Sequence, residues 1–449
     1  MVQDSEKHVA IVGSGAAGLA AAWLLSKRHR VTLLEKDDRL GGHAHTATVA
    51  GQGATQLKID TGFIVYNEPS YPNLTRWFEA MQIETENSDM SFSVSRDNGN
   101  FEYAGGPLFG LMAQPGLPLQ RRFWRMLLDL LRFYRQAPGQ IPGDCTMTLG
   151  EYLQEHRYSQ AFIDDHLLPF GAAIWSTPKQ QMLQYPAASF IRFCANHGLL
   201  QISNRPQWRT VTGGSERYVD AVHQAIGSDS VVTGFAVTRV ERGLDEVLVH
   251  AEDGRSIQAD EVVLATHADQ ALACLDKPSM AEQSLLSPFS YEINRAVLHT
   301  DISYLPRRRR AWSSWNYVER SAIDATRVSL SYWMNRLQNL GGQTEYIVTL
   351  NPDTPPPDER VLRSHTYEHP VFTADTWHAQ QQLWTLQGQN RTWFCGSYFG
   401  SGFHEDAVQS GFAVAEQLGK VARPWTLSNP STRIVVNATP SLQAGGLVA

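Results

Sequence analysis

Three glycines near the start of the chain have the spacing of a phosphate-binding turn. Gly13, Gly15 and Gly18 directly follow the short apolar run 8–12, and residues 16–25 are rich in helix-forming types. The first glycine permits a tight turn, the second lets the backbone approach a pyrophosphate at the start of the helix, and the third lets the helix pack on the strand. The pattern predicts a strand, a turn and a helix that bind a dinucleotide.

An acidic residue completes this unit. Residues 30–34 form a second apolar strand, and Glu35 ends it about 20 residues after the glycines, where dinucleotide-binding proteins place a ribose-binding acid. A carboxylate at this position repels the 2′-phosphate of NADP, so NAD or FAD is expected. Since strand, helix and acid agree, we favour a dinucleotide site over a glycine-rich turn in another kind of α/β protein.

Three adjacent residues near the other end of the chain, His404, Glu405 and Asp406, could each bind a metal or move a proton. On a helix, however, neighbouring side chains diverge by about 100°, so the three cannot all face one ion. The chain also lacks an HExxH motif, a cysteine cluster and a regular acidic loop. We therefore predict no metal site, and interpret the segment as a strand at 392–395, a glycine-rich turn and a helix.

Composition limits the class of protein. The chain has 449 residues, which favours two domains, and its formal net charge of -7 argues against a nucleic-acid partner. Its four cysteines have no metal-ligand spacing and indicate a reducing compartment. The N-terminus does not resemble a signal peptide, and no apolar run is long enough to span a bilayer. We expect a cytoplasmic protein, with peripheral contact to the inner face of the membrane left open.

Beyond Glu35 the chain reads KDDRLGGHAHT, and this segment resembles the R-x-G-G fingerprint of the amine-oxidase and carotenoid-desaturase superfamily of FAD-dependent oxidoreductases. Three later stretches, which begin at Lys58, Val211 and Asp260, are similar to segments with which that superfamily surrounds the flavin. The resemblance implies an α/β fold, in which a discontinuous Rossmann-type FAD-binding domain carries an inserted α+β substrate domain. It also implies FAD as the cofactor, which we expect to be bound noncovalently.

The resemblance implies cofactor contacts along the whole chain. The positions are Gly13, Gly15, Ala16, Ala17, Gly18, Glu35, Lys36, Arg39, Gly41, Gly42, His43, Thr61, Gly62, Phe63, Val237, Gly396, Glu405, Asp406, Ala407 and Val408. In the resembling families, the last of these segments turns backbone amides toward the flavin pyrimidine. Asp406 stands where amine oxidases usually have glycine, and we expect it to cap the helix rather than face the flavin. His43 stands where many amine oxidases have arginine, which leaves its role open.

The implied domains are discontinuous. The FAD-binding domain comprises residues 1–75, 205–290 and 385–425, and the substrate domain comprises residues 76–204 and 291–384. Apolar residues show helical spacing in the first insert, whereas β-branched and aromatic types dominate the second. Residues 426–449 are expected to form a loosely ordered tail.

Within the superfamily, the stretches LLPFGAAIWSTP and SYWMNRLQ look like those of bacterial proteins associated with cyclopropane and other modified fatty acids. That resemblance implies hydride transfer from an apolar substrate, a lipid fatty-acyl chain, to flavin N5, with an unknown electron acceptor. Three alternatives stay open: an amine oxidase that uses oxygen, a polyene isomerase or saturase, and a non-catalytic lipid-binding flavoprotein that assists a fatty-acid methyltransferase. Amine oxidases generally place a lysine near N5, and no matching segment here contains one.

Such a reaction also needs an acceptor for the second hydrogen, and six residues are candidates for this role. They are His166, Tyr185, His197, Asn316, Tyr332 and His404. Each has an ordinary packing explanation as well. We retain His404 as the catalytic candidate, because it lies beside the segment that is expected to face the flavin.

Residues 121–135 carry five arginines and several large apolar side chains at helical spacing. Such a helix suits contact with anionic lipid headgroups, and it equally suits a helix packed on its own domain with a solvated basic face. A second basic run, Arg307–Arg310, is either an exposed turn or a lipid phosphate site. Spacing alone leaves both alternatives open for each segment.

Overall fold

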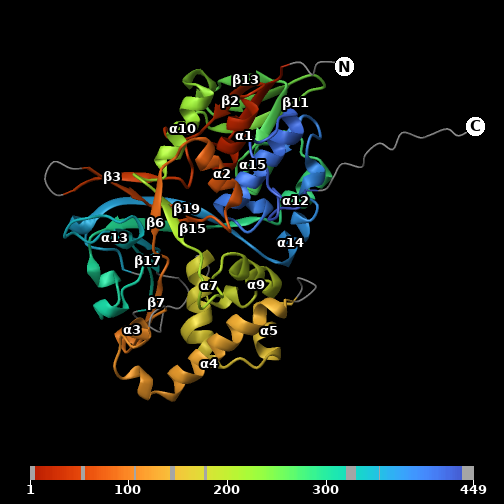
Figure 1. Cartoon of the computed structure of the whole chain (residues 1–449). Helices are drawn as coiled ribbons and strands as arrows, with labels where there is room; N and C mark the ends of the chain where they lie inside the picture. Colours follow the sequence, from red (N-terminus) through yellow and green to blue (C-terminus); the bar gives the residue numbers. More distant parts are fainter. Residues whose placement is uncertain are drawn as a thin grey trace, which may run out of the picture. The chain divides into compact units, whose positions relative to one another are not determined.

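The computed structural model describes the chain except for residues 1–5, 52–55, 106–107, 142–146, 176–178, 320–329, 353 and 437–449. The chain divides into two compact units. Unit 1 comprises Met1–Arg39, Ser228–Pro288 and His378–Ala449, and unit 2 comprises Leu40–Gly227 and Phe289–Trp377. Each unit has its own sheets (Figure 1).

Unit 1 is built on a parallel five-stranded sheet of order β10-β2-β1-β14-β20. Its strands are β1 (His8–Val12), β2 (Arg30–Leu34), β10 (Val231–Val232), β14 (Glu261–Leu264) and β20 (Thr392–Phe394). Nearly every residue of β1 and β14 is buried, which explains why these strands are continuous apolar runs in the sequence. Val12 pairs with both Leu34 and Leu264, so the carboxyl ends of three strands meet at one edge of the sheet.

Helices α1 (Ala16–Leu25) and α15 (His404–Gly419) lie side by side in unit 1 (Figure 1). Their backbones approach so closely that a Cβ atom added at Gly411 would lie 2.3 Å from the carbonyl oxygen of Ala17. The unit also contains an antiparallel meander and two further helices. These elements are β11 (Val237–Arg242), β12 (Val247–Ala251), β13 (Ser256–Ala259), α11 (Ala268–Cys274) and α12 (Met280–Leu286).

Unit 2 contains a seven-stranded sheet of order β19-β15-β18-β17-β16-β7-β8. Its strands are β7 (Phe92–Arg96), β8 (Phe101–Ala104), β15 (Ser290–His299), β16 (Trp315–Val318), β17 (Leu330–Trp333), β18 (Ile347–Leu350) and β19 (Val361–Val371). Two small antiparallel sheets accompany it. They are formed by β3 (Thr46–Ala50) with β4 (Gln56–Asp60), and by β5 (Tyr66–Asn67), β9 (Trp208–Val211) and β6 (Thr85–Ser88).

The helices of unit 2 are mostly short, and Figure 1 shows several of them gathered around α4. Their bounds are α2 (Pro72–Ala80), α3 (Leu108–Leu111), α4 (Arg121–Gln136), α5 (Leu149–Glu155), α6 (Gln160–Phe162), α7 (Leu168–Trp175), α8 (Lys179–Met182), α9 (Ala187–Asn196), α10 (Glu216–Ile226) and α13 (Met334–Leu337). Helix α14 (Ala374–Gln380) crosses the boundary between the units. A π-helical turn, Ile163–Leu167, joins α6 to α7.

This architecture confirms the predicted fold class, because unit 1 has the strand–helix–strand order and the parallel sheet of a Rossmann-type domain. Residues 40–75 and 205–227, which the sequence assigns to the FAD-binding domain, belong to unit 2 by their contacts. The two compact units are defined by contacts, whereas the predicted domains are defined by whether they bind FAD or substrate. The predicted FAD-binding and substrate domains therefore stay a prediction.

The described part of the tail lies against α15. Ile434 is buried, and the backbone N–H of Arg433 donates to the side-chain oxygen of Gln409 at 3.0 Å. The guanidinium of Arg433 lies 3.5 Å from the Asp406 carboxylate. Arg433 and Ile434 therefore contact unit 1, whereas residues 437–449 of the predicted loose tail lie outside the described residues.

Candidate functional site

The turn between β1 and α1 requires glycine at two of its three predicted positions. Gly13 has a φ of +99°, and a Cβ atom there would lie 2.8 Å from the carbonyl oxygen of Ala265. A Cβ atom at Gly18 would lie 1.9 Å from the carbonyl oxygen of Gly13. At these two positions, the packing of the protein itself therefore requires glycine.

Gly15 differs from the other two glycines. Its φ and ψ of -65° and 178° suit any residue, and a Cβ atom there would have no heavy atom of the described chain within 4 Å. The space beside Gly15 is thus open at the start of α1. No described side chain caps this helix, so the first N–H groups, those of Ala16 and Ala17 among them, point toward that space without an intrahelical acceptor. Open space and amide donors together suit a pyrophosphate.

Glu35 is held at the end of β2 by neighbouring amides. One carboxylate oxygen accepts the backbone N–H of Ser14 at 2.9 Å and also the Ser14 hydroxyl, and the other accepts the backbone N–H of Asp37 at 3.1 Å. The side chain is buried, so it is fixed beside the glycine turn as a ribose-binding acid should be. Ser14 is a contributor that the glycine pattern alone does not indicate.

The segment around His404 forms a strand, a turn and a helix, as its glycines predict. The helix begins at His404 and continues to Gly419, so Asp406 lies in its first turn. Its first turn contains Glu405, Ala407 and Val408, all buried. The Gln409 amide donates to Glu405 at 2.9 Å, which holds that carboxylate within the helix.

Asp406 caps this helix. Its carboxylate accepts the backbone N–H of Phe403 at 2.8 Å, and Arg433 approaches its other oxygen. Burial raises the pKa of Asp406, whereas Arg433 and the backbone N–H groups oppose the shift. The carboxylate therefore points along the backbone, as the sequence predicts. Burial lowers the pKa of His404 to about 3, so its imidazole is neutral at physiological pH, and the same burial disfavours the imidazolium that would form if it accepted a proton.

Unit 2 carries the predicted cofactor positions from Gly41 to Phe63. Gly41 and Gly42 have φ of +108° and +56°, so both need glycine's freedom. A Cβ atom at Gly62 would lie 2.1 Å from the carbonyl oxygen of His43, which brings the two predicted segments together. Phe63 donates its backbone N–H to the same oxygen at 2.8 Å. Of the remaining predicted positions, in unit 1, Lys36 is exposed, Arg39 is half-buried and Val237 is the first residue of β11.

A cluster of aromatic residues lies next to these segments. His365, Tyr367 and His369 alternate along β19 and therefore share one face of the strand. Ring centroids of His45 and His365 are 4.5 Å apart, and those of His43 and Tyr367 are 4.9 Å apart. The Tyr367 hydroxyl lies 2.7 Å from Thr61 Oγ1. The alternation in HTYEH is a signal in the sequence that points to this shared face, although these residues belong to none of the predicted cofactor segments.

The described residues contain no group of three or more His, Cys, Asp or Glu side chains arranged to hold a metal ion. The histidines of the cluster instead contact one another and Tyr367 through their rings.

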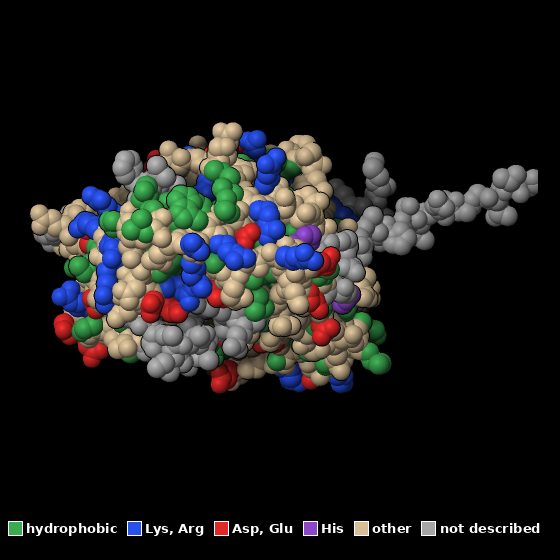
Figure 2. Space-filling view, turned by 90° about the horizontal axis from the view of Figure 1, so that it is seen from below, with side chains coloured by type: hydrophobic (Ala, Val, Ile, Leu, Met, Phe, Trp, Pro, Cys, Tyr) green, Lys and Arg blue, Asp and Glu red, His purple; other side chains and the backbone are tan. Residues whose placement is uncertain are grey.

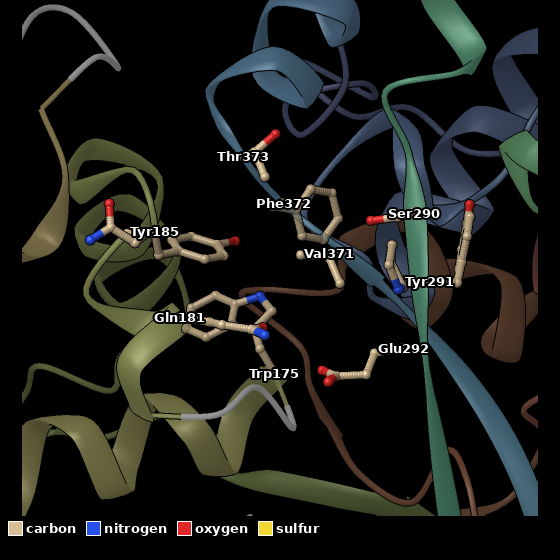
Figure 3. Close-up of a pocket in the computed structure, with 11 residues that line it drawn as sticks. Trp175, Gln181, Tyr185, Ser290, Tyr291, Glu292, Val371, Phe372 and Thr373 are labelled. Carbon is tan, nitrogen blue, oxygen red and sulfur yellow. The ribbon is translucent and has the colours of Figure 1, made fainter. Parts of the chain in front are cut away.

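A cavity of about 400 Å³ lies in unit 2. Residues of helices α7 and α8 line one side of it, and the ends of strands β15 and β19 line the other. Figure 3 shows the rings of Trp175 and Tyr185 on one side, and Val371 and Phe372 on the other. Glu292, on β15, is the acidic residue among the described lining residues, and burial raises its pKa. The cavity thus combines aromatic and aliphatic side chains with one carboxyl group and with the uncharged polar side chains of Gln181, Gln184, Ser290 and Thr373.

The family model of flavin-containing amine oxidoreductases matches residues 16–301, which is more than half of the chain. The chain belongs to the flavin-containing amine oxidoreductase family. This finding confirms the resemblance, the cofactor FAD and, at the level of the family, an FAD-dependent oxidoreductase. The open space at Gly15, the helix amides and the buried Glu35 fit the pyrophosphate and ribose of that cofactor. Noncovalent attachment stays a prediction.

Two kinds of known protein resemble this chain: some are similar in sequence over part of their length, and others have a similar fold. An L-amino-acid oxidase of Siganus canaliculatus is 25% identical over 318 residues, which cover 66% of this chain and 57% of that protein. The chain thus spans little more than half of this curated relative. Among solved structures, a cyclohexylamine oxidase of Brevibacterium oxydans has a TM-score of 0.66 at 16% identity and covers 92% of this chain and 100% of that one. A fatty acid isomerase of P. acnes has a TM-score of 0.66 at 16% identity and covers 94% and 99%.

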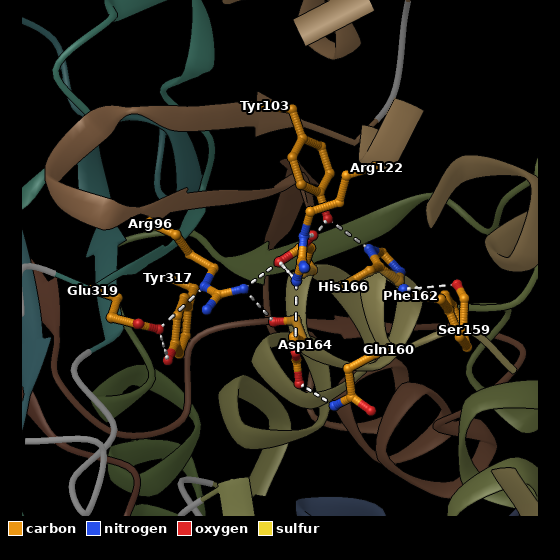
Figure 4. A network of polar contacts seen from close by, with 11 residues as sticks. Arg96, Tyr103, Arg122, Ser159, Gln160, Phe162, Asp164, His166, Tyr317 and Glu319 are labelled. Carbon is orange, nitrogen blue, oxygen red and sulfur yellow. Dashed lines mark hydrogen bonds and ion pairs between the residues drawn. The ribbon is translucent and has the colours of Figure 1, made fainter. Parts of the chain in front are cut away.

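For this flavin-containing family member, the six acid–base candidates lie in different surroundings. Both ring nitrogens of His166 contact tyrosine hydroxyls, that of Tyr103 at 2.8 Å (Figure 4) and that of Tyr134 at 3.2 Å, and burial lowers the pKa of His166 to about 3. His197 and Asn316 are also buried and hydrogen-bonded within unit 2. The side chains of these three residues are thus held by hydrogen bonds within unit 2.

The other candidates differ from these. Tyr185 lines the cavity, whereas Tyr332 packs edge-on against Trp315 with ring centroids 5.2 Å apart, and burial raises its pKa. The catalytic assignment of His404 stays a prediction. Across the described residues, no helix combines the length and the apolar character needed to cross a lipid bilayer.

Asp60 fixes the strand that leads into Thr61 and Gly62. Its carboxylate accepts the Ser215 hydroxyl at 2.8 Å, the Ser215 backbone N–H at 2.9 Å, the Gln338 amide at 2.9 Å and the Thr46 hydroxyl at 2.5 Å. Burial raises the pKa of Asp60 from an ordinary value of 3.8 to about 7, despite these donors.

This pKa predicts a pH dependence of stability. Because the folded state holds the Asp60 proton more tightly than the unfolded chain does, the free energy of unfolding should fall as pH rises from 4 to 7. The Asp60 contribution to that fall is roughly 3 kcal/mol. Urea unfolding of the wild type and of Asp60→Asn at pH 5 and pH 8 measures this contribution. The free energy of unfolding should fall more between the two pH values in the wild type than in the variant. Parallel curves for the two proteins would contradict the assignment.

Proposed function

We propose that the protein oxidises a fatty-acyl chain, with FAD as the hydride acceptor. The observation that carries this proposal is the cavity in unit 2, whose walls include Trp175, Tyr185, Val371 and Phe372. Aromatic and aliphatic walls favour an apolar ligand, because removing its surface from water is favourable. One relative in fold is named as a fatty acid isomerase, which is consistent with an acyl substrate in this architecture.

The chemistry divides between cofactor and chain. FAD, when bound, supplies an acceptor for a hydride. A hydride from one acyl carbon would pass to FAD, and a proton from its neighbour would pass to a base, for which His404 is the candidate predicted from the sequence; a double bond would remain, and the product would be about two mass units lighter. The residues of the cavity would hold the acyl carbons between Trp175 and Phe372 and exclude water from them.

Glu292 favours a second candidate function, the oxidation of an amine. An ammonium group in the cavity would be attracted by this carboxylate and by the faces of Trp175 and Tyr185. The L-amino-acid oxidase and the cyclohexylamine oxidase, which resemble the chain, are named for substrates of this class. An acyl chain, in contrast, has no group that needs Glu292.

One experiment separates the two functions. FAD-loaded protein is mixed anaerobically with a panel of phospholipids and free fatty acids, and in parallel with a panel of amines and amino acids. Bleaching of the oxidised-flavin absorbance by lipids, with an acyl product about two mass units lighter, supports the proposal. Bleaching by amines alone would replace it with amine oxidation. A lipid product of unchanged mass with a moved double bond would replace it with isomerisation.

Two cavity variants sharpen this test. Trp175→Ala should lower the bleaching rate at low substrate concentration by roughly 10- to 100-fold in either case, because it removes an aromatic wall. Glu292→Gln keeps the shape of the side chain and should change the rate by less than about twofold with an acyl substrate. The same change should cost about tenfold or more with an amine, whose charge partner it removes. Unchanged rates for Trp175→Ala would place the substrate elsewhere.

A further inference from the structure

Helix α4 (Arg121–Gln136) presents two different faces. Phe123, Met126, Phe133 and Tyr134 are buried and attach the helix to unit 2. The opposite face exposes large apolar side chains, of which Leu128 is 66% exposed. Figure 2 views this side of the molecule and shows apolar side chains gathered among Lys and Arg side chains.

The exposed apolar residues and the exposed arginines are interleaved. At about 100° per residue, positions 121, 124, 125, 128, 131 and 135 fall within an arc of about 120°. Arg121, Arg125 and Arg135 are exposed there, together with Trp124, Leu128 and Leu131. We call these six residues the α4 face.

The segment before the helix extends this face. The indole N–H of Trp124 donates to the carbonyl oxygen of Pro118 at 2.8 Å, so the ring lies against the turn that carries Leu119. Leu119 is 88% exposed. The apolar surface therefore continues beyond the helix.

The arginines of the α4 face differ from the other two arginines of the helix in their ion pairs. Among the described residues, no acid pairs with Arg121, Arg125 or Arg135. The two other arginines of the helix do have partners: Arg122 contacts Asp165 at 2.6 Å, and Arg132 contacts Asp129 at 3.0 Å. A local excess of positive charge therefore lies on a chain whose formal net charge is -7.

From this geometry we propose that the α4 face docks on the surface of an anionic lipid bilayer. Leu128 and Trp124 would enter the interfacial region, and the three arginines would contact lipid phosphates. A second copy of this chain is a poorer partner, because a symmetric pairing would bring the same arginines together. The second basic run does not share this chemistry, since Arg308 contacts Glu102 at 2.9 Å and Arg309 contacts Glu345 at 3.0 Å. Docking does not depend on which substrate the enzyme oxidises.

The test is sedimentation of the FAD-loaded full chain with vesicles. Vesicles of equal parts phosphatidylglycerol and phosphatidylcholine should carry the protein down, and vesicles of phosphatidylcholine alone should not. Raising the salt concentration should weaken the sedimentation, because it screens the headgroup charge. Failure of the wild-type protein to sediment with the anionic vesicles would overturn the proposal and leave an acidic protein as the partner for this face.

Matched variants assign the binding to the α4 face. The triple variant Arg121→Gln, Arg125→Gln, Arg135→Gln should bind anionic vesicles roughly 100-fold more weakly, at about fivefold per arginine. The control Arg30→Gln, Lys277→Gln, Arg360→Gln removes the same charge from exposed residues elsewhere in the described chain and should bind like wild type. Equal loss in both triple variants, or loss in neither, would contradict the assignment.

A second variant tests the apolar part of the face without changing its charge. Trp124→Gln with Leu128→Gln should weaken binding by roughly 10-fold or more, and the deficit should persist at high salt. Unchanged flavin content and thermal midpoint would show that each variant protein is folded. Glycerol phosphate at the same phosphate concentration should not release the protein; release by it would show a site for a free phosphate rather than for a membrane.

Discussion

Replacement of Gly15 by alanine is expected to remove the flavin from the protein without unfolding it. The backbone conformation at Gly15 suits alanine, and the new methyl group would meet no described atom of the chain within 4 Å. It would, however, occupy the space beside the first amides of α1, where a pyrophosphate must approach the backbone. The ratio of flavin to protein after purification should fall at least about tenfold, which corresponds to about 1.4 kcal/mol of binding free energy.

Gly18→Ala provides the matched control for this prediction. Both variants add one methyl group to the same turn, yet at Gly18 the methyl group would lie 1.9 Å from the carbonyl oxygen of Gly13. We expect that variant to lose stability by roughly 1–3 kcal/mol or to fail to fold, whether or not FAD is present. For the Gly15→Ala apoprotein, the free energy of unfolding should instead differ from that of the wild-type apoprotein by only a few tenths to about 1 kcal/mol.

The two variants separate two roles of the glycine motif: Gly15 gives the cofactor access to the backbone, and Gly18 lets the chain pack closely. If Gly15→Ala keeps its full flavin content, the pyrophosphate does not lie beside Gly15, and the assignment of the α1 start as its binding site is wrong. If Gly15→Ala unfolds like Gly18→Ala, the open space in unit 1 is filled by the chain itself, which would contradict the geometry of the turn.

The sequence predicts this part of the molecule well because its information is local. The turn, the helix and Glu35 lie within one stretch of the chain, and each residue type follows from backbone geometry at its own position. The same holds for Asp406, whose capping contact with Phe403 spans three residues. A motif of this length can be recognised without knowing how the rest of the chain folds.

The cavity could not be predicted in the same way. Its walls come from Trp175 and Tyr185 on the helical side and from Glu292 and Phe372 at the ends of paired strands. Strand pairing over such separations depends on the register of β15 with β19, which no local pattern specifies. The sequence identified Tyr185 only as one of six acid–base candidates, and it gave no reason to group it with the other lining residues.

For the basic helix, the sequence likewise cannot show which arginines have an acidic partner. Spacing places the arginines of 121–135 on one amphipathic helix, which the structure bears out. It cannot show that Arg122 has a buried acid as a partner, because Asp165 lies 43 residues away in another element. Only the structure separates this arginine from Arg121 and Arg125, so an experiment that changed all three would have mixed a structural contact with a surface charge.

Replacement of Asp165 by asparagine is therefore expected to lower the free energy of unfolding by about 3 kcal/mol. Asp165 is 2% exposed and accepts two hydrogen bonds from Arg122, at 2.6 Å and 3.0 Å, and a further one from Arg96 (Figure 4). An amide in this place removes the negative charge between two guanidinium groups and turns one N–H group toward them. Arg96 keeps Glu319 as a partner, and Arg122 is half exposed, so the loss lies at the low end of the range for broken buried pairs.

The neighbouring acid gives the control. Asp164 lies 3.5 Å from Arg122, but its side chain is 32% exposed, and such pairs contribute little because water screens them. Asp164→Asn should therefore change the free energy of unfolding by less than about 0.5 kcal/mol in the same urea titration. Flavin content should stay unchanged in both folded variants, since this network touches no predicted cofactor position. Equal effects of the two substitutions would mean that Asp165 is not the residue that ties α4 to unit 2, and the buried attachment of α4 would then rest on Phe123, Met126 and Phe133 alone.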